Sequence, residues 1–289
     1  MTATDVIPSP RQKAIRPRAW LIAAICFGVI AIMLAPLVLS TLASFKPLAE
    51  TSAVPPNYLP RDLTLDNYSK VANYQQGIWN YVQNSLVVAA MTIAICLVLA
   101  VPAGYGLARF QVPGKEALFL LLLASMMVPY QSLLVPLYLM FVKLGLTASH
   151  FGLAILHTIL QLPFSIYLMR NSFEAIPKEL EEAATVDGAS SFFVFRRVFL
   201  PLTGPGMVTV ALFAFIMSWN EFIGALILMN TETSFTVPIM LTGVVSGDFG
   251  SVDWGALQAS VMISIVPCML VFVSLQRYYV SGFLSGAVK

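Results

Sequence analysis

Charged residues are scarce in this 289-residue sequence. Asp, Glu, Lys and Arg make up only 10% of it, compared with about 25% in an average soluble protein. Hydrophobic residues account for 58%, and the mean hydropathy is +0.82. This balance excludes a soluble globular domain and predicts an integral membrane protein. The net charge of +2 is too small to indicate binding to nucleic acid.

The sequence also lacks the motifs of common nucleotide and metal sites. It contains no GxxxxGK[ST] and no HExxH, and Gly114-Lys115-Glu116 is expected to be a simple turn. The two histidines, His150 and His157, have no further metal ligands near them in sequence. Three cysteines lie in apolar stretches, where small buried hydrophobes are expected: Cys26, Cys96 and Cys268. We therefore expect no enzyme, metal or bound cofactor, so active transport would draw its energy from a partner or an ion gradient.

Six apolar segments are present, each close to or above the roughly 20 residues that cross a bilayer. They cover residues 20–45, 84–108, 117–142, 151–169, 202–229 and 256–275. The first is too long for the apolar core of a signal peptide and is predicted to be an uncleaved helix. Cleavage near Ala43 and Ser44 is the alternative. The third contains Pro129, Gln131 and Pro136, which predict a kinked or broken helix.

Basic residues lie mostly on one side of these segments. Six spans place both termini on one side, and that side holds 12 of the 16 Lys and Arg residues. The positive-inside rule then makes both termini cytoplasmic. We expect an all-α membrane protein with a cytoplasmic N-terminal tail (1–19) and one transmembrane domain (20–289), which includes a cytoplasmic loop (171–200).

The cytoplasmic loop carries strong local signals. Pro177, followed by three acidic residues within 179–182, predicts the start of a helix, because acidic side chains suit the positive end of the helix dipole. Gly188 can adopt the left-handed conformation that ends many helices. Either Ser190 or Ser191 can cap a second short helix. The loop is therefore predicted to be a helix, a sharp bend and a second helix.

The same loop contains a more specific pattern: Glu182-Ala183-Ala184, Gly188 six residues after the glutamate, and then Val198, Leu200 and Pro201. This pattern resembles the cytoplasmic EAA loop of ABC importer permeases, which usually have Ile where this chain has the similar Val198. Shorter runs resemble the carbohydrate branch of these permeases, above all the second, six-helix permease of maltose-type importers. These runs are 84–85, 135–138, 144–146, 218–222, 276–277 and 286–289.

The resemblance implies a type I ABC importer permease fold in the bacterial cytoplasmic (inner) membrane. Such a permease moves a sugar or sugar-like polar solute inward by alternating access. The implied partners are a second, homologous permease in a heterodimer, two cytoplasmic ATPase subunits that use ATP and Mg²⁺, and an extracytoplasmic solute-binding protein. Glu182 and Asp187 would make polar contacts with an ATPase subunit. Ala183 and Ala184 would pack against it, and Gly188 would form the bend.

Within the apolar segments, Glu221 is the only acidic or basic residue. Such a residue is expected to face the interior of the bundle or a wet cavity. At helical spacing, Glu221 shares a face with small and polar residues: Ala211, Ala214, Ser218 and Ala225. Asn220 lies beside this face, and His157 and Gln161 are one turn apart in another segment. These residues are candidates for a translocation pathway or a subunit interface, and for Glu221 the interface is favoured over solute contact.

Two other classes of function are compatible with this composition. An ion-coupled secondary transporter would need no ATPase, but would ordinarily show internal repeats and several intramembrane ionisable residues. A structural or assembly protein would need no cytoplasmic helix shaped for a partner. The sequence does not specify the solute, nor whether this chain or its partner permease contacts it.

Overall fold

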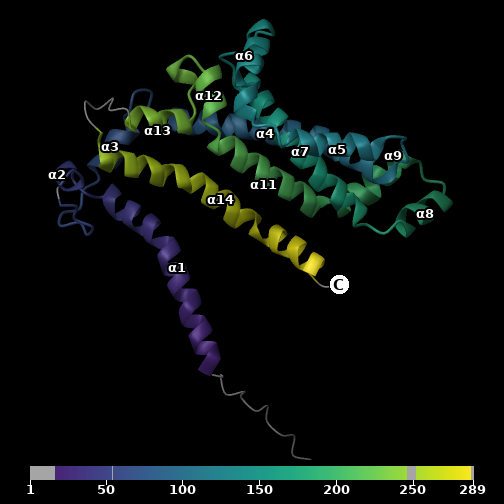
Figure 1. The fold of residues 1–289 in the computed structure, drawn as a ribbon, viewed down its shortest axis with the longest axis horizontal. Coiled ribbons are helices and arrows are strands. Elements are labelled where there is room, and N and C mark those ends of the chain that lie inside the picture. The colour runs from purple at the N-terminus through teal and green to yellow at the C-terminus, as the bar shows by residue number, and fades with distance from the viewer. Residues whose placement is uncertain (1–16, 54, 246–251, 288–289) are drawn as a thin grey trace, which may run out of the picture.

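The computed structural model describes residues 17–53, 55–245 and 252–287, which form helices and connecting turns without a β-strand (Figure 1). The α-helices are α1 (Pro17–Ser44), α2 (Leu48–Thr51), α3 (Asp66–Ala72), α4 (Ile78–Arg109), α5 (Lys115–Ser125), α6 (Leu134–Lys143), α7 (His150–Glu174), α8 (Glu179–Val186), α9 (Ser191–Val194), α10 (Leu200–Leu202), α11 (Gly204–Asn220), α12 (Ile223–Leu228), α13 (Val237–Val245) and α14 (Trp254–Ala287). The 3₁₀-helices are η1 (Tyr130–Leu133) and η3 (Glu232–Ser234), and η2 (Phe195–Phe199) is a π-helix. The predicted all-α class is confirmed. Most of the predicted N-terminal tail lies outside the described residues.

Four helices of the described chain are long and apolar enough to cross a membrane: α1, α4, α7 and α14. The number rises to six if each of two bent helix pairs is one span. In one pair, α5 and the η1–α6 unit meet at 91°, at the predicted break beside Pro129. In the other, the helical run 191–202 meets α11 at 69°. The six predicted segments therefore have helical counterparts, while the cytoplasmic location of the termini stays a prediction.

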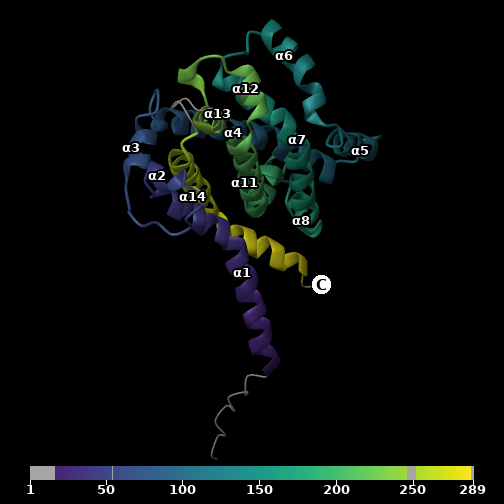
Figure 2. The ribbon, with the colours of Figure 1, turned by 60° about the vertical axis from the view of Figure 1, so that its left-hand side comes forward.

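A bundle of α4, α7 and α11 forms the centre of the molecule, and α14 packs against α11 and α1 (Figures 1 and 2). Helices α4 and α7 approach closely at Gly104. A methyl group on Gly104 would lie 2.6 Å from Cβ of Met169 and 2.8 Å from the backbone nitrogen of Arg170. Only glycine allows this approach, as is common between membrane helices. Helices α5 and α6 lie on the outside of the bundle (Figure 2), where Phe119 of α5 stacks on Tyr167 of α7 and Phe141 of α6 is buried.

The prediction of one continuous helix over 202–229 is wrong. Helix α11 ends at Asn220, Glu221 has an extended backbone with ψ of 123°, and α12 begins at Ile223. The Glu221 carboxylate accepts hydrogen bonds from the backbone N–H groups of Gly224 and Ala225. These groups lie at the start of α12, so the side chain stabilises the helix break. The sequence has no proline or glycine at residue 221 that would indicate such a break.

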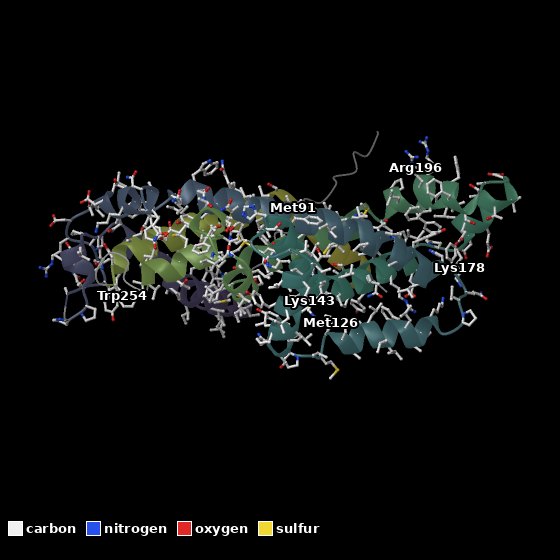
Figure 3. The ribbon with its side chains drawn as sticks, turned by 90° about the horizontal axis from the view of Figure 1, so that it is seen from above. Met91, Met126, Lys143, Lys178, Arg196 and Trp254 are labelled. Atoms are coloured by element: carbon white, nitrogen blue, oxygen red, sulfur yellow. The ribbon has the colours of Figure 1, made fainter. Side chains whose placement is uncertain are left out.

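The two ends of the long axis differ in content. Helices α2, α3 and α13 gather at one end, and α8 and α9 form the other (Figure 1). In Figure 3, Lys178 and Arg196 lie at the α8–α9 end, and Trp254 lies toward the opposite end. The predicted extramembrane stretch before residue 84 contains α2, α3 and the first turns of α4.

The start of α14 is held by a polar junction with α3. Asp253 accepts a hydrogen bond from the Ala256 N–H at 3.0 Å, which makes it the N-cap of α14, and its other oxygen lies 2.6 Å from Nζ of Lys70. Burial raises the pKa of this carboxyl group, but the bonds from Lys70 and Ala256 and the charge of Lys70 outweigh it. The net result is a pKa below the ordinary 3.8.

This lowered pKa predicts how the stability of the protein depends on pH. The folded pKa of Asp253 lies below the unfolded pKa, so the ionised carboxylate stabilises the folded state above about pH 3.8. This stabilisation is lost as the pH falls through the folded pKa. We expect Asp253→Asn, which cannot ionise, to lower stability by about 1 kcal/mol at pH 6. The difference from wild type in thermal unfolding in detergent should shrink below pH 4. A difference that is constant from pH 6 to pH 3 would contradict the role of the charge.

Candidate functional site

The segment of residues 179–199, which we call the α8–η2 segment, folds into the predicted helix, bend and helix. Gly188 has φ of +79°, in the left-handed region that favours glycine. The Gly188 N–H binds the Thr185 carbonyl at 3.0 Å, and the Ala189 N–H binds the Ala184 carbonyl at 3.0 Å. This pair of bonds is a Schellman motif, which ends α8. The Ser190 hydroxyl accepts the Phe193 N–H at 3.3 Å and caps α9.

One face of α8 is left free by the rest of the chain. Glu182, Ala183, Asp187 and Gly188 are exposed, whereas Ala184 is half-buried against the core cluster at the ends of α4 and α7. Within the described ranges, neither the Glu182 nor the Asp187 side chain forms a hydrogen bond or an ion pair. The face therefore combines unpaired acidic groups with small residues, a surface suited to the groove of another protein.

A second polar site lies inside the bundle, where α7 meets the break between α11 and α12. Nδ1 of His157 is 2.8 Å from the Ser218 hydroxyl, and Nε2 of His157 is 3.2 Å from Oε2 of Glu221. All three side chains are buried. A neutral imidazole satisfies both contacts, with Nε2–H donating to Glu221 and Nδ1 accepting from Ser218.

The Glu221 carboxylate is saturated by four donors. Oε1 accepts from the Tyr130 hydroxyl at 2.8 Å and from the Gly224 N–H at 2.7 Å. Oε2 accepts from His157 and from the Ala225 N–H, at 3.2 and 3.0 Å. A carboxylate has about four lone-pair positions, so no acceptor capacity is left for a solute. All four donors belong to this chain, and the predicted contact of Glu221 across a subunit interface stays a prediction.

The other sequence candidates are placed differently. Asn220 is exposed, and its amide donates to the Ile216 carbonyl of its own helix. Gln161 is buried one turn from His157, but its Nε2 has no hydrogen-bond partner in the part of the chain that the structure describes. The predicted face from Ala211 to Ala225 ends at Ser218, because the backbone leaves the helical path at Glu221.

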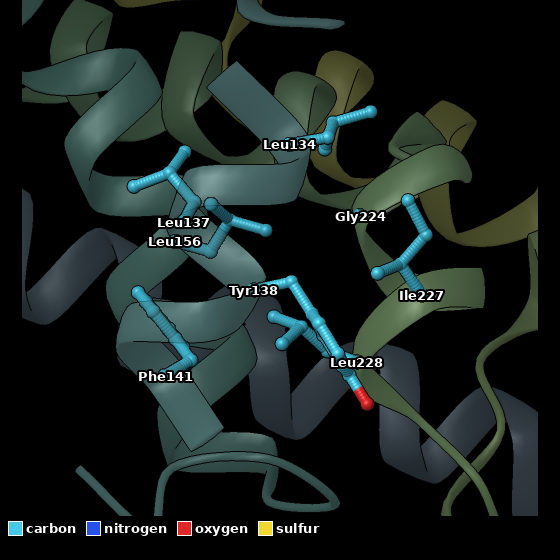
Figure 4. A pocket seen from close by; sticks show the side chains of 8 residues that line it. All are labelled: Leu134, Leu137, Tyr138, Phe141, Leu156, Gly224, Ile227 and Leu228. Carbon is cyan, nitrogen blue, oxygen red and sulfur yellow. The ribbon is translucent and has the colours of Figure 1, made fainter. Parts of the chain in front are cut away.

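A cavity of about 840 Å³ lies beside this cluster, between the α5–η1 break, α7 and the α11–α12 break. Tyr130, Asn220 and Glu221 provide polar groups on a largely apolar wall that includes Pro163 and Met217. It is large enough for a small solute, because ligand pockets commonly measure about 300 to 1,000 Å³. The apolar pocket of Figure 4, lined by residues such as Leu134 and Phe141, holds only about 10 Å³ and is too small for one.

Tyr130 and Arg109 are functional candidates that sequence reasoning missed. Tyr130 lies directly after Pro129 at the helix break, and Arg109 is the last residue of α4. A hydroxyl next to an expected break was the one available signal for Tyr130. Among the described residues, no group of three or more His, Cys, Asp or Glu side chains could hold a metal ion.

Comparison with known proteins agrees with this arrangement. A family model described as "Binding-protein-dependent transport system inner membrane component" matches residues 100–284. The chain is 39% identical over 231 residues to the probable ABC transporter permease protein YurM of Bacillus subtilis, covering 80% of this chain and 76% of the relative. It is 34% identical over 248 residues to the diacetylchitobiose uptake system permease protein DasC of Streptomyces coelicolor, covering 85% and 88%.

The fold also matches a solved structure. It is similar to a chain in the crystal structure of a bacterial ABC transporter involved in the import of the acidic polysaccharide alginate, with a TM-score of 0.78 and 24% identity. The match covers 92% of this chain and 99% of that chain. The arrangement of α4, α7, α11 and the α8–η2 segment is thus that of a known transporter fold.

Proposed function

Because this chain belongs to the family of binding-protein-dependent transport system inner membrane components, we propose that it is the permease subunit through which an ABC importer moves a sugar or sugar-like solute inward. The chain is a multi-pass component of the inner membrane and not an enzyme. The proposal of a sugar is supported by the likeness to a permease for diacetylchitobiose uptake. Family membership favours this function over the ion-coupled carrier that the sequence left open.

The observation that carries the coupling role is the free face of the α8–η2 segment. Glu182, Ala183 and Asp187 are exposed at the far end of the molecule and are not used by the chain's own fold. Their function is to seat in a groove of an ATPase subunit, with Gly188 setting the angle between the two helices. ATP and Mg²⁺ are used by two such subunits, and this chain binds neither.

The solute passes beside the break between α11 and α12. The cavity there is lined by one exposed amide, that of Asn220. Glu221 stabilises the helix break through its bond to the Gly224 N–H. A second, homologous permease covers the open side of the cavity in a heterodimer and shares the solute contacts. An extracytoplasmic binding protein delivers the solute at the end that contains α2, α3 and α13.

The proposal is tested by purifying the chain from its native membrane in mild detergent and identifying the proteins that accompany it. We expect a P-loop ATPase and a second permease, with ATPase activity in the eluate. Reconstituted vesicles should take up a labelled oligosaccharide only with the binding protein and ATP. Recovery of the chain alone, active in uptake without ATP, would contradict the proposal.

A further inference from the structure

Arg109, the last residue of α4, is buried against the point where α7 turns into α8. Its guanidinium donates to the carbonyls of Phe173 and Ile176, at 2.6 and 2.5 Å. Phe173 is in the last turn of α7 and Ile176 follows its end, a position where the helix dipole favours a cation. The side chain is only 3% exposed, although it carries a full charge at the edge of the bundle.

The same guanidinium touches both helices of the α8–η2 segment. Its Nη1 lies 3.9 Å from a carboxylate oxygen of Glu181 in α8, and its central carbon lies 4.5 Å from the ring centroid of Phe199 in η2. A planar guanidinium can bind two carbonyls and stack on a ring at once, which a lysine ammonium does not reproduce. Arg109 therefore connects α4, the α7–α8 corner, α8 and η2.

An aromatic cage one turn earlier in α4 reinforces this contact. The ring of Tyr105 lies 5.4 Å from Phe173, 4.8 Å from Phe195 and 5.5 Å from Phe199, measured between centroids. The Tyr105 hydroxyl is buried and has no hydrogen-bond partner among the described residues. The ring rather than the hydroxyl thus makes the contact between α4 and the α8–η2 segment.

Helix α4 extends from this contact to the opposite end of the molecule. Near its start, the Asn84 amide donates to the carbonyls of Thr233 and Phe235, at 2.8 and 2.9 Å. The neighbouring Ser85 hydroxyl accepts the N–H of Val237, the first residue of α13. Asn84 and Arg109 are about 38 Å apart along an ideal helix. Helix α4 therefore contacts η3 and α13 at one end and the α8–η2 segment at the other.

We infer that Arg109 is a positioning residue for coupling: it makes the α7–α8 corner rigid, so that displacement of α8 moves α4 and α7 together. The inference rests on the proposed function, because it assumes that ATPase subunits displace α8. Helix α4 and the α8–η2 segment are not consecutive in the chain, because α5, η1, α6 and α7 lie between them. Without the guanidinium, α8 would rotate about the α7–α8 corner without displacing α4 and α7.

The test uses the complete transporter, reconstituted in vesicles with its binding protein and a labelled oligosaccharide. Lysine in Arg109→Lys cannot bind both carbonyls as the guanidinium does. The loss of one hydrogen bond from a charged group should lower uptake about tenfold. The ATPase rate should stay within about twofold of wild type, so that more ATP is consumed per solute moved. Lys143→Arg, at an exposed lysine in the last turn of α6 outside the α8–η2 segment, is the control and should leave the ratio unchanged.

A second pair of variants separates coupling from folding. Tyr105→Leu removes the ring and should raise the ATP consumed per solute, whereas Tyr105→Phe removes only the unpaired hydroxyl and should not. Recovery of assembled complex is measured for every variant. An unchanged ratio in both Arg109→Lys and Tyr105→Leu would overturn the inference, as would parallel loss of uptake, ATPase activity and assembly. Wild-type vesicles without ATP-dependent uptake would instead overturn the proposed function.

Discussion

Replacing Gly188 by proline should abolish uptake while leaving the chain assembled in the membrane. Proline fixes φ near −65°, but the bend after α8 needs the +79° of Gly188. Proline also removes the N–H that binds the Thr185 carbonyl, so the Schellman motif cannot form. The bend stands outside the bundle, with no atom within 4 Å of a Cβ at this position. The defect should therefore stay in the α8–η2 segment, and uptake in vesicles with co-purification of the ATPase measures it.

Gly188→Asn is the matched control, because asparagine adopts left-handed backbone conformations more easily than other non-glycine residues. It should keep most of the uptake that Gly188→Pro loses. Glu182→Lys should also abolish uptake, since it reverses the charge of an exposed side chain that the chain's own fold does not use. Glu182→Lys should lower stability by no more than about 1 kcal/mol, the usual effect of a reversed charge in the first turn of a helix. Normal uptake in both Gly188→Pro and Glu182→Lys would refute the coupling role of the segment.

Replacing Glu221 by glutamine should destabilise the folded protein by about 1–3 kcal/mol, the usual cost of an unsatisfied buried polar group. A glutamine has one acceptor oxygen, whereas the four groups around Glu221 all donate. Its NH₂ group would face N–H donors at the start of α12, so the hydrogen bonds that stabilise the helix break would be lost. Thermal unfolding of the purified complex in detergent, together with uptake, measures the effect.

Two further variants make this result specific. Tyr130→Phe removes one of the four donors and leaves the carboxylate, so it should cost only about 1 kcal/mol. Asn220→Ala removes an exposed amide next to Glu221 and should leave stability unchanged. Wild-type stability in Glu221→Gln would show that the carboxylate does not hold the break. Wild-type stability combined with lost uptake would assign Glu221 a direct part in the pathway.

Much of the fold could be predicted from the sequence because its signals are local. A long apolar run forms a helix in lipid, since no water is available for its backbone groups. The break beside Pro129 follows from a missing N–H, and the bend at Gly188 follows from the need for positive φ. Each of these is decided by a residue and its immediate neighbours, and each is present in the structure.

The intramembrane site could be predicted only in part. Glu221 stood out as the single charged residue in the apolar segments, Ser218 was predicted to share its face, and His157 was a separate candidate in another segment. The helical periodicity that grouped Glu221 with Ala225 was misleading, because the helix breaks between them. Tyr130 was missed because it comes from another segment, 91 residues away in the chain.

The sequence by itself determined the helical membrane class, the places where local backbone chemistry bends or breaks a helix, and the family pattern around Gly188. Only the tertiary structure decided which groups Glu221 and Arg109 contact. The partners of both come from distant segments: His157 is 64 residues before Glu221, and the Phe173 carbonyl is 64 residues after Arg109. A buried charge must find its donors or acceptors wherever packing supplies them, and that supply depends on how helices meet rather than on neighbouring residues.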